Sequence, residues 1–201
     1  MTYLIRRLLF ADRARCAQIA TLARVIALLI PATLCGCAAQ PQYGSSYYDQ
    51  RAVVAYRGKD FVTAREQWSK ALALDSNSVR ALNNLGYLLY YGMGGSQDQD
   101  RAVTMWTRAA HMGHSESQWH LGIAYKDGTA APQSNIEAYA WYRCAIASAA
   151  AASDRGKEIV ENRISHDAQV WLNDLSSQMS PDQLVLAEQL AKQYIDRYAG
   201  R

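Results

Sequence analysis

The sequence repeats itself with a period of 36 residues. Six pairs of related side chains align when the chain is shifted by 36 positions: Leu85 with Leu121, Gly86 with Gly122, Gly92 with Gly128, Ala102 with Ala138, Trp106 with Tyr142, and Ala109 with Ala145. Periods of about 20–50 residues are typical of proteins built from stacked supersecondary units. One such unit cannot bury its apolar face alone, so the repeat requires a stack with a continuous core.

Each repeat predicts two helices separated by a turn. The apolar residues of the first helix have the i, i+3, i+7 spacing of one helix face: Leu82, Leu85 and Leu89. The second helix has an inner face of small and large residues: Ala102, Trp106, Ala109 and Ala110. Gly92 lies after the first helix, where a left-handed residue commonly ends it. Gly86 lies inside that helix and costs about 1 kcal/mol relative to alanine, so we expect a neighbouring helix to approach closely there.

These motifs resemble Sel1-like repeats, the 36-residue relatives of tetratricopeptide repeats. In that family a Leu-Gly pair in the first helix is followed by a glycine-bearing loop and an alanine- and aromatic-rich second helix. Residues 81–113 follow this pattern, and residues 121–145 follow it again. The resemblance implies an all-α solenoid of antiparallel helix pairs, with Sel1-like repeats at 79–114 and 115–150.

A third helix pair is expected upstream, at residues 48–78. Ala64, Trp68 and Ala71 resemble the second helix of an ordinary tetratricopeptide repeat. The first helix fits less well, because Ala52 and Ala55 replace the usual glycine and tyrosine. We therefore expect looser packing in this repeat.

The C-terminal residues 151–201 predict two further helices. Ser180 begins a capping signal, with Pro181 at the first helical position and Gln183 at the third. A stack of helix pairs exposes an apolar face at its end, so we interpret these two helices as a cap.

Residues 1–36 have the pattern of a targeting signal. The apolar run 25–34 follows an arginine-rich stretch and has ten residues, whereas a membrane-spanning helix needs about 20. The run ends in Leu-Cys-Gly-Cys37, which resembles the lipobox of bacterial lipoprotein precursors. The resemblance implies cleavage before Cys37, attachment of diacylglycerol and an acyl chain such as palmitate to that residue, and a tether over residues 37–47.

The lipobox resemblance also predicts a location. Ala38 follows the lipidated cysteine, whereas enteric lipoproteins retained at the inner membrane have aspartate there. We therefore expect the protein at the periplasmic face of the outer membrane, anchored through Cys37. An ordinary secretory signal and a membrane-anchored N-terminal helix remain as alternatives.

The distribution of charge argues against a nucleic-acid surface on the folded part. The formal net charge is +3, but residues 1–36 contain five arginines and one aspartate. From residue 37 onward the chain has 16 basic and 17 acidic residues. A nucleic-acid-binding domain carries an excess of basic charge, which this part of the chain lacks.

We find no motif for catalysis, so the sequence predicts a protein that is not an enzyme and needs no cofactor. It lacks Gly-x-Ser-x-Gly, His-Glu-x-x-His and a glycine-rich phosphate loop ending in Gly-Lys. His111 and His114 have no carboxylate spaced to complete a metal site, so we predict no metal. We interpret Cys144 as a core thiol.

The remaining candidate site is a surface. In stacked helix pairs the first helix of each pair lines the concave side, and its outward positions form a candidate groove for a protein or peptide partner: Tyr56, Arg57, Asn83, Tyr87, Tyr90, Trp119, Ile123 and Lys126. Tyrosine and tryptophan are effective anchors because they offer large contact areas with few rotatable bonds. The alternative is that several of these aromatic residues pack against 151–198 and belong to the core.

These observations predict a non-enzymatic scaffold or adaptor lipoprotein of the bacterial cell envelope. A pilotin-like assembly factor for a secretin or another outer-membrane machine is one alternative. A cell-wall enzyme or a regulator of one is the other.

Overall fold

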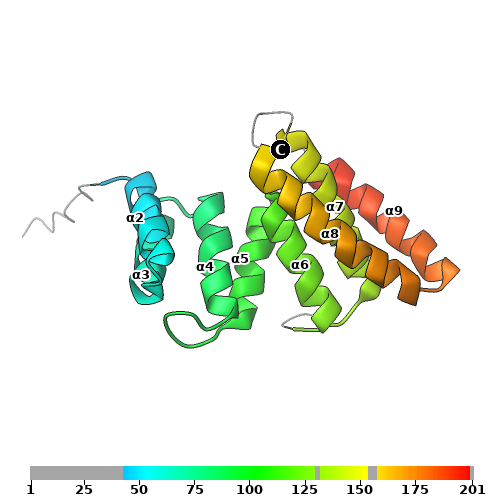
Figure 1. Ribbon diagram of the computed structural model, residues 1–201, viewed down its shortest axis with the longest axis horizontal. Coiled ribbons are helices and arrows are strands. Elements are labelled where there is room, and N and C mark those ends of the chain that lie inside the picture. Colours follow the sequence, from blue (N-terminus) through cyan, green and yellow to red (C-terminus); the bar gives the residue numbers. More distant parts are fainter. Residues whose placement is uncertain (1–42, 130–131, 154–157, 200–201) are drawn as a thin grey trace, which may run out of the picture. The chain divides into compact units, whose positions relative to one another are not determined.

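The computed structural model describes residues 43–129, 132–153 and 158–199 (Figure 1). This part of the chain forms eight helices and no strand: α2 (Ser45–Arg57), α3 (Phe61–Leu74), α4 (Val79–Tyr90), α5 (Gln99–His111), α6 (Ser115–Asp127), α7 (Asn135–Ser153), α8 (Glu158–Gln178) and α9 (Pro181–Tyr198). The expected signal peptide and Cys37 lie outside the described residues. No helix in the described ranges is long and apolar enough to cross a bilayer.

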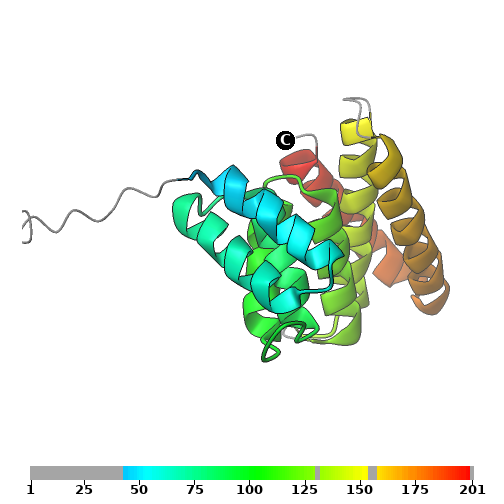
Figure 2. The same cartoon turned by 60° about the vertical axis from the view of Figure 1, so that its left-hand side comes forward.

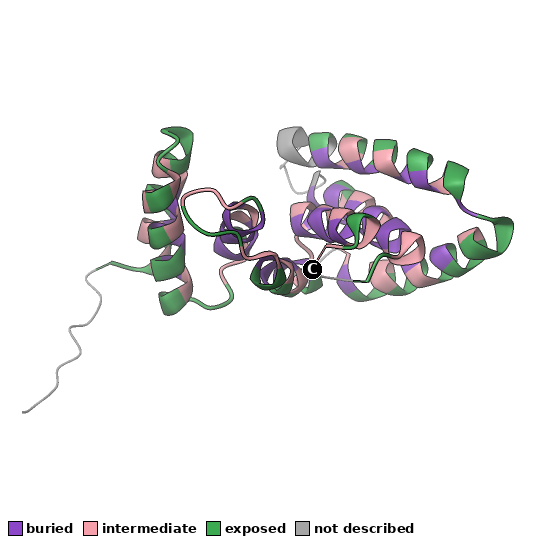
Figure 3. Cartoon of the chain, turned by 90° about the horizontal axis from the view of Figure 1, so that it is seen from below, coloured by how far each residue is buried: buried purple, intermediate pink, exposed green. Residues whose placement is uncertain are grey.

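Consecutive helices pack as pairs that stack on one another (Figures 1 and 2). The pairs are α2–α3, α4–α5 and α6–α7, and they are joined by contacts of α3 with α4 and of α5 with α6. Helices α8 and α9 both pack on α7, and the buried faces of the helices point inward (Figure 3). The expected fold class, an all-α solenoid closed by C-terminal helices, is confirmed.

The repeated residues make the core. Leu82, Leu85 and Leu89 are at most 2% exposed, and Trp106 and Tyr142 are equally buried. Each of these two rings lies against the helix glycine of its own repeat. A Cβ atom at Gly86 would lie 2.7 Å from Trp106 Nε1, and one at Gly122 would overlap the Tyr142 ring. Close helix packing therefore explains both glycines.

The turn inside each repeat is built in the same way. Gly92 and Gly128 have φ values of +67° and +69°, as expected for left-handed residues that follow a helix. In each turn a glutamine side chain donates to a carbonyl near the end of the preceding helix, Gln97 to Tyr90 O at 2.7 Å and Gln133 to Lys126 O at 2.9 Å. Each turn thus satisfies one of the carbonyls that a helix end leaves free.

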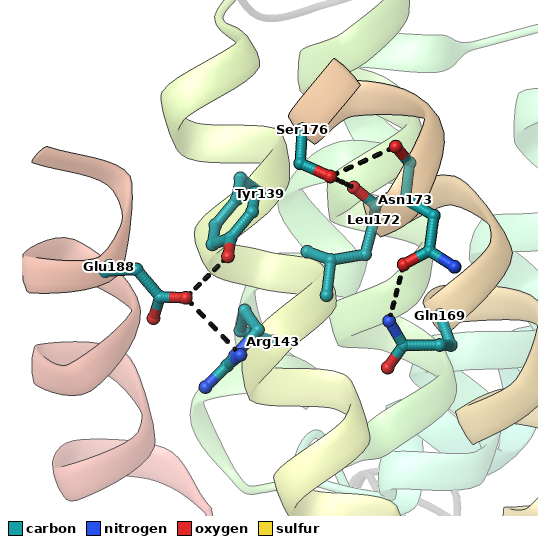
Figure 4. Close-up of polar contacts among 7 residues, drawn as sticks. All are labelled: Tyr139, Arg143, Gln169, Leu172, Asn173, Ser176 and Glu188. Carbon is teal, nitrogen blue, oxygen red and sulfur yellow. Dashed lines mark hydrogen bonds and ion pairs between the residues drawn. The ribbon is translucent and has the colours of Figure 1, made fainter. Parts of the chain in front are cut away.

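The C-terminal cap is attached to α7 by polar as well as apolar contacts (Figure 4). The Tyr139 hydroxyl donates to Glu188 Oε1 at 2.5 Å, and Arg143 Nη1 lies 3.4 Å from the same oxygen. Ser180 accepts a hydrogen bond from the Gln183 backbone and donates its own N–H to the Gln183 side chain. The predicted capping box at the start of α9 is confirmed.

The first repeat is packed more closely than its sequence predicts. Ala52 is fully buried, as are Ala64 and Ala71. Asp49 is 7% exposed and accepts a hydrogen bond from Trp68 Nε1 at 3.0 Å. Its second carboxylate oxygen lies 3.0 Å from Arg80 Nη2 of the next repeat. One buried carboxylate therefore joins α2, α3 and α4.

We expect Asp49→Ala to lower the free energy of unfolding by about 1–2 kcal/mol, because it leaves the buried indole N–H of Trp68 without an acceptor. Urea unfolding followed by circular dichroism measures the loss. Gln50→Ala, at an exposed position on the same helix, is the control and should have almost no effect. Equal effects of the two substitutions would show that Asp49 does not hold the repeat together.

A candidate binding cleft on the first helices of the repeats

A cleft of about 530 Å³ opens between the first helices of the three repeats and α8. It is lined by Val53, Tyr56 and Arg57 of α2, Trp68 of α3, Asn83, Asn84 and Tyr87 of α4, Glu116, Trp119 and His120 of α6, and Arg163, Ile164 and Asp167 of α8. Five of the eight predicted groove residues lie here: Tyr56, Arg57, Asn83, Tyr87 and Trp119. The structure thus brings together residues that lie far apart in the sequence.

Three predicted groove residues lie elsewhere. Tyr90 is 6% exposed, with its ring centroid 4.9 Å from that of Trp106, so it belongs to the core between α4 and α5. Ile123 packs against the core cluster that α7, α8 and α9 share. The Lys126 ammonium lies 4.4 Å from the centre of the Trp171 ring of α8.

Trp119 packs against the same cluster as Ile123, and that cluster includes Ala168 and Leu172 of α8, although Trp119 also lines the cleft. The alternative that groove aromatics pack on 151–198 therefore holds in part, for Trp119.

Aromatic rings form a continuous layer along the cleft. The centroid of Tyr56 lies 6.5 Å from that of Tyr87, and Tyr87 lies 5.8 Å from His120. Trp119 continues the layer, 5.0 Å from His120. Tyr56 is 36% exposed, and Tyr87 and Trp119 are half-buried. Each side chain is therefore partly packed against the protein and partly accessible to a ligand. Such rings are held in place before a ligand arrives.

Asn83 has a structural role at the base of the cleft. Its side chain is 2% exposed and accepts a hydrogen bond from Ser117 Oγ at 2.8 Å. Its amide nitrogen donates to Glu116 Oε2 at 3.0 Å and to Asn84 Oδ1 at 3.2 Å. These bonds join α4 to α6, so Asn83 positions the walls of the cleft and offers little surface to a partner.

His120 lies under the aromatic layer as a neutral group. It is 3% exposed and stacks on Trp106, with centroids 4.4 Å apart. Burial, with a smaller contribution from nearby His114, lowers the pKa of His120 to about 3. The base of the cleft therefore has no positive charge at neutral pH.

The charged side chains of the cleft are mixed in sign. Arg57 and Arg163 come from α2 and α8, and both are exposed. Neither forms an ion pair within 4.0 Å with another described side chain. Glu116 and Asp167 add carboxylates to the same cleft. This arrangement suits a polar polypeptide better than a ligand of one charge sign.

The other residues singled out by sequence have structural roles. His111 stacks on Tyr198, with centroids 4.5 Å apart, and His114 accepts the Ser117 N–H at the start of α6. No group of three potential metal ligands occurs among the described residues. Cys144 is fully buried, and burial raises its pKa to about 12, which confirms that it is a core thiol.

Comparison with known proteins agrees with this geometry. The sequence model described as Sel1 repeat matches residues 79–114 and 115–149. The chain carries two Sel1 repeats. They contain the Leu-Gly and alanine-aromatic motifs described above, which confirms the resemblance. Sel1 repeat proteins generally mediate protein–protein interactions.

Solved structures with a similar fold include c5321, a protective antigen of uropathogenic Escherichia coli strains displaying an SLR fold. It is 25% identical, has a TM-score of 0.65, and the match covers 79% of this chain and 31% of c5321. This chain therefore spans about a third of that protein. A Sel1 repeat protein from Oxalobacter formigenes is 21% identical over 71% of this chain and 54% of its own, with a TM-score of 0.49. No protein with a curated description matches the sequence.

The repeat period itself could have identified more of the cleft. Asn84 and His120 are 36 residues apart and both line it, although neither was among the predicted groove residues. The α8 residues Arg163, Ile164 and Asp167 had no such signal, because α8 lies outside the repeats. Only the packing of α8 on α7 and α6 places them at the cleft.

Proposed function

We propose that this protein is a non-enzymatic adaptor of the bacterial cell envelope that holds a segment of a protein partner in the cleft. The observation that carries the proposal is the layer of accessible rings, Tyr56, Tyr87 and Trp119, on the first helices of three stacked repeats. Large aromatic side chains dominate binding energy at protein interfaces because they bury much area at little entropic cost.

The form of the cleft favours a segment over a whole domain. Its volume of about 530 Å³ accommodates a few side chains. An extended or helical peptide inserts its anchors into such a groove and leaves its polar atoms at the rim. Arg57 and Arg163 are available there for carboxylates or carbonyls of the partner.

We expect the double substitution Tyr87→Ala with Trp119→Ala to abolish capture of the partner and to preserve helical content. The measurement is crosslinking and pull-down from the native envelope, read by mass spectrometry, beside circular dichroism of the purified variant. Val185→Ala with Leu186→Ala is the control, because these α9 side chains are exposed outside the cleft. Retained capture by a folded cleft variant would refute the proposed site.

The identity of the captured partner separates the alternatives. A single outer-membrane partner supports the adaptor. A secretin whose localisation fails without this protein would favour the pilotin-like assembly factor, and peptidoglycan enzymes would favour the regulator of cell-wall cleavage.

The proposal includes a lipid anchor at Cys37, at the periplasmic face of the outer membrane. It is supported by the apolar run and the lipobox-like Leu-Cys-Gly-Cys37 sequence. Several acyl chains on one residue give stable membrane attachment.

We expect Cys37→Ser to remove the lipid mass from the N-terminal peptide and to prevent this mode of membrane attachment. Fractionation of the envelope and mass spectrometry of the mature protein measure both effects. Identical fractionation of wild type and variant, with no lipid mass on either, would contradict the anchor and favour an ordinary secretory signal.

A further inference from the structure

One face of α2 is exposed to solvent and has no partner among the described helices. Its residues recur at the spacing of a helix face and include Val54, which is 71% exposed. Tyr43, just before the helix, is 42% exposed. We refer to Tyr43, Tyr47, Arg51 and Val54 together as the tyrosine–arginine face.

The side chains of this face are ordered by contacts with one another. The rings of Tyr43 and Tyr47 stack with centroids 4.0 Å apart and an interplanar angle of 15°. Arg51 Nη1 donates to the Tyr47 hydroxyl at 3.2 Å, and its guanidinium carbon lies 5.8 Å from the ring centre. These contacts order Tyr43, Tyr47 and Arg51 relative to one another, and Val54 adds an exposed apolar side chain to the same face.

The electrostatics of the surrounding chain are positive. Asp49 is the only acidic residue in 43–59, and it is buried against Trp68 and paired with Arg80. The three cations of this segment, Arg51, Arg57 and Lys59, are all exposed. Arg57 also lines the cleft and the exposed Asp60 follows Lys59, so Arg51 is the cation that the face itself presents. An exposed positive surface attracts anionic lipid headgroups within a Debye length of about 8 Å.

The position of the face in the chain suggests what covers it. Tyr43 lies six residues after Cys37, a distance that extended chain spans in at most about 21 Å. Tyrosine is enriched at the interface between membrane and water, where its ring and hydroxyl contact different environments. The face therefore lies within reach of the surface to which the chain is anchored.

We propose that the tyrosine–arginine face docks on an anionic phospholipid surface beside the anchor and orients the solenoid there. This inference rests on the proposed lipidation of Cys37. A second copy of the chain fits less well, because a symmetric contact would bring the same cations together. Docking leaves the cleft open, since Tyr56 follows Val54 by two residues and points about 200° away around the helix.

The test uses the lipidated full-length protein with Val54→Cys, labelled with an environment-sensitive fluorophore and reconstituted in vesicles. In the proposed mature lipoprotein, Cys16 and Cys35 are cleaved off with the signal peptide and Cys37 is acylated. Cys144 is fully buried, so labelling is directed to the introduced cysteine. Val185→Cys on α9, where the valine is 57% exposed, is the matched control. Vesicles of phosphatidylethanolamine with phosphatidylglycerol are compared with vesicles of phosphatidylcholine alone.

We expect a blue shift and brighter emission at position 54 in anionic vesicles, reduced by high salt and by Arg51→Glu, and no change at position 185. Equal spectra at both positions, with the lipid mass present on Cys37, would overturn docking and leave the anchor intact. Absence of the lipid mass would overturn the anchor and docking with it. A shift that depends on protein concentration without vesicles would instead assign the face to a second copy.

Discussion

Gly122→Ala is expected to lower the free energy of unfolding by about 2 kcal/mol, although alanine is the better helix former. The gain in helix propensity is about 1 kcal/mol. The opposing effect is the overlap of the new Cβ atom with the Tyr142 ring, which is fully buried. Overpacking of this kind costs about 3 kcal/mol, so the steric effect dominates. Urea unfolding followed by circular dichroism measures the difference.

Two further variants separate the clash from a general effect of alanine. Gly44→Ala, at the N-cap of α2, is an alanine without a clash, because nothing beyond its chain neighbours lies within 4 Å of a Cβ built there. Only the small loss typical of alanine at an N-cap is expected. The second is Gly122→Ala in a Tyr142→Ala background, where the ring is absent and the substitution should cost nothing. An equal loss in both backgrounds would mean that the glycine is not required by the ring.

The repeat predicted the fold because the residues that recur every 36 positions are the same residues that pack the helices together. Gly86 with Trp106, and Gly122 with Tyr142, are helix contacts that recur every 36 residues. A side chain and the glycine that accommodates it are both visible in the sequence, so the helix pairs and their turns followed from it. The upstream pair, α2 and α3, was harder to predict from the sequence, because the buried Asp49 replaces part of that packing with a hydrogen bond from Trp68.

The candidate cleft was only partly predictable, since its boundaries depend on tertiary contacts. Tyr90 lies about one helical turn after Tyr87 but faces Trp106 of α5. Counting helix positions in the sequence is too coarse to distinguish these two directions. Ile123 and Lys126 contact the C-terminal helices and do not line the groove. The repeat pattern could not predict this, because α8 lies outside the repeats. The sequence therefore predicted which helices line the cleft, whereas the boundary of the cleft depends on how the C-terminal helices pack.

His120 should make the stability of the fold depend on pH in a range where carboxylates titrate little. Its folded-state pKa is lowered to about 3 by burial, whereas an unfolded histidine titrates near pH 6.5, about its model-peptide value. The unfolded chain therefore binds a proton more readily than the folded one. The stability from neutral His120 is complete above the unfolded pKa and is lost progressively as the pH falls below it.

Between pH 7 and pH 5 this linkage amounts to about 2 kcal/mol, because one proton is bound on unfolding across most of the interval. The amount hardly depends on the folded pKa of His120, because that pKa, at about 3, lies well below 5. His120→Phe keeps an aromatic ring in this place and removes the titration. The loss of unfolding free energy on acidification should therefore fall by about 2 kcal/mol in this variant.

The control for this measurement is His166→Gln, which removes an exposed histidine of α8. Urea unfolding at several pH values between 5 and 7 gives the slope for each protein. Wild type and His166→Gln should share the steep slope, and His120→Phe should be nearly flat apart from the remaining titratable groups. A wild-type slope that survives His120→Phe would mean that the proton is taken up elsewhere. A flat profile in the variant would instead identify His120, the ring beneath the cleft, as the group that takes up the proton on unfolding.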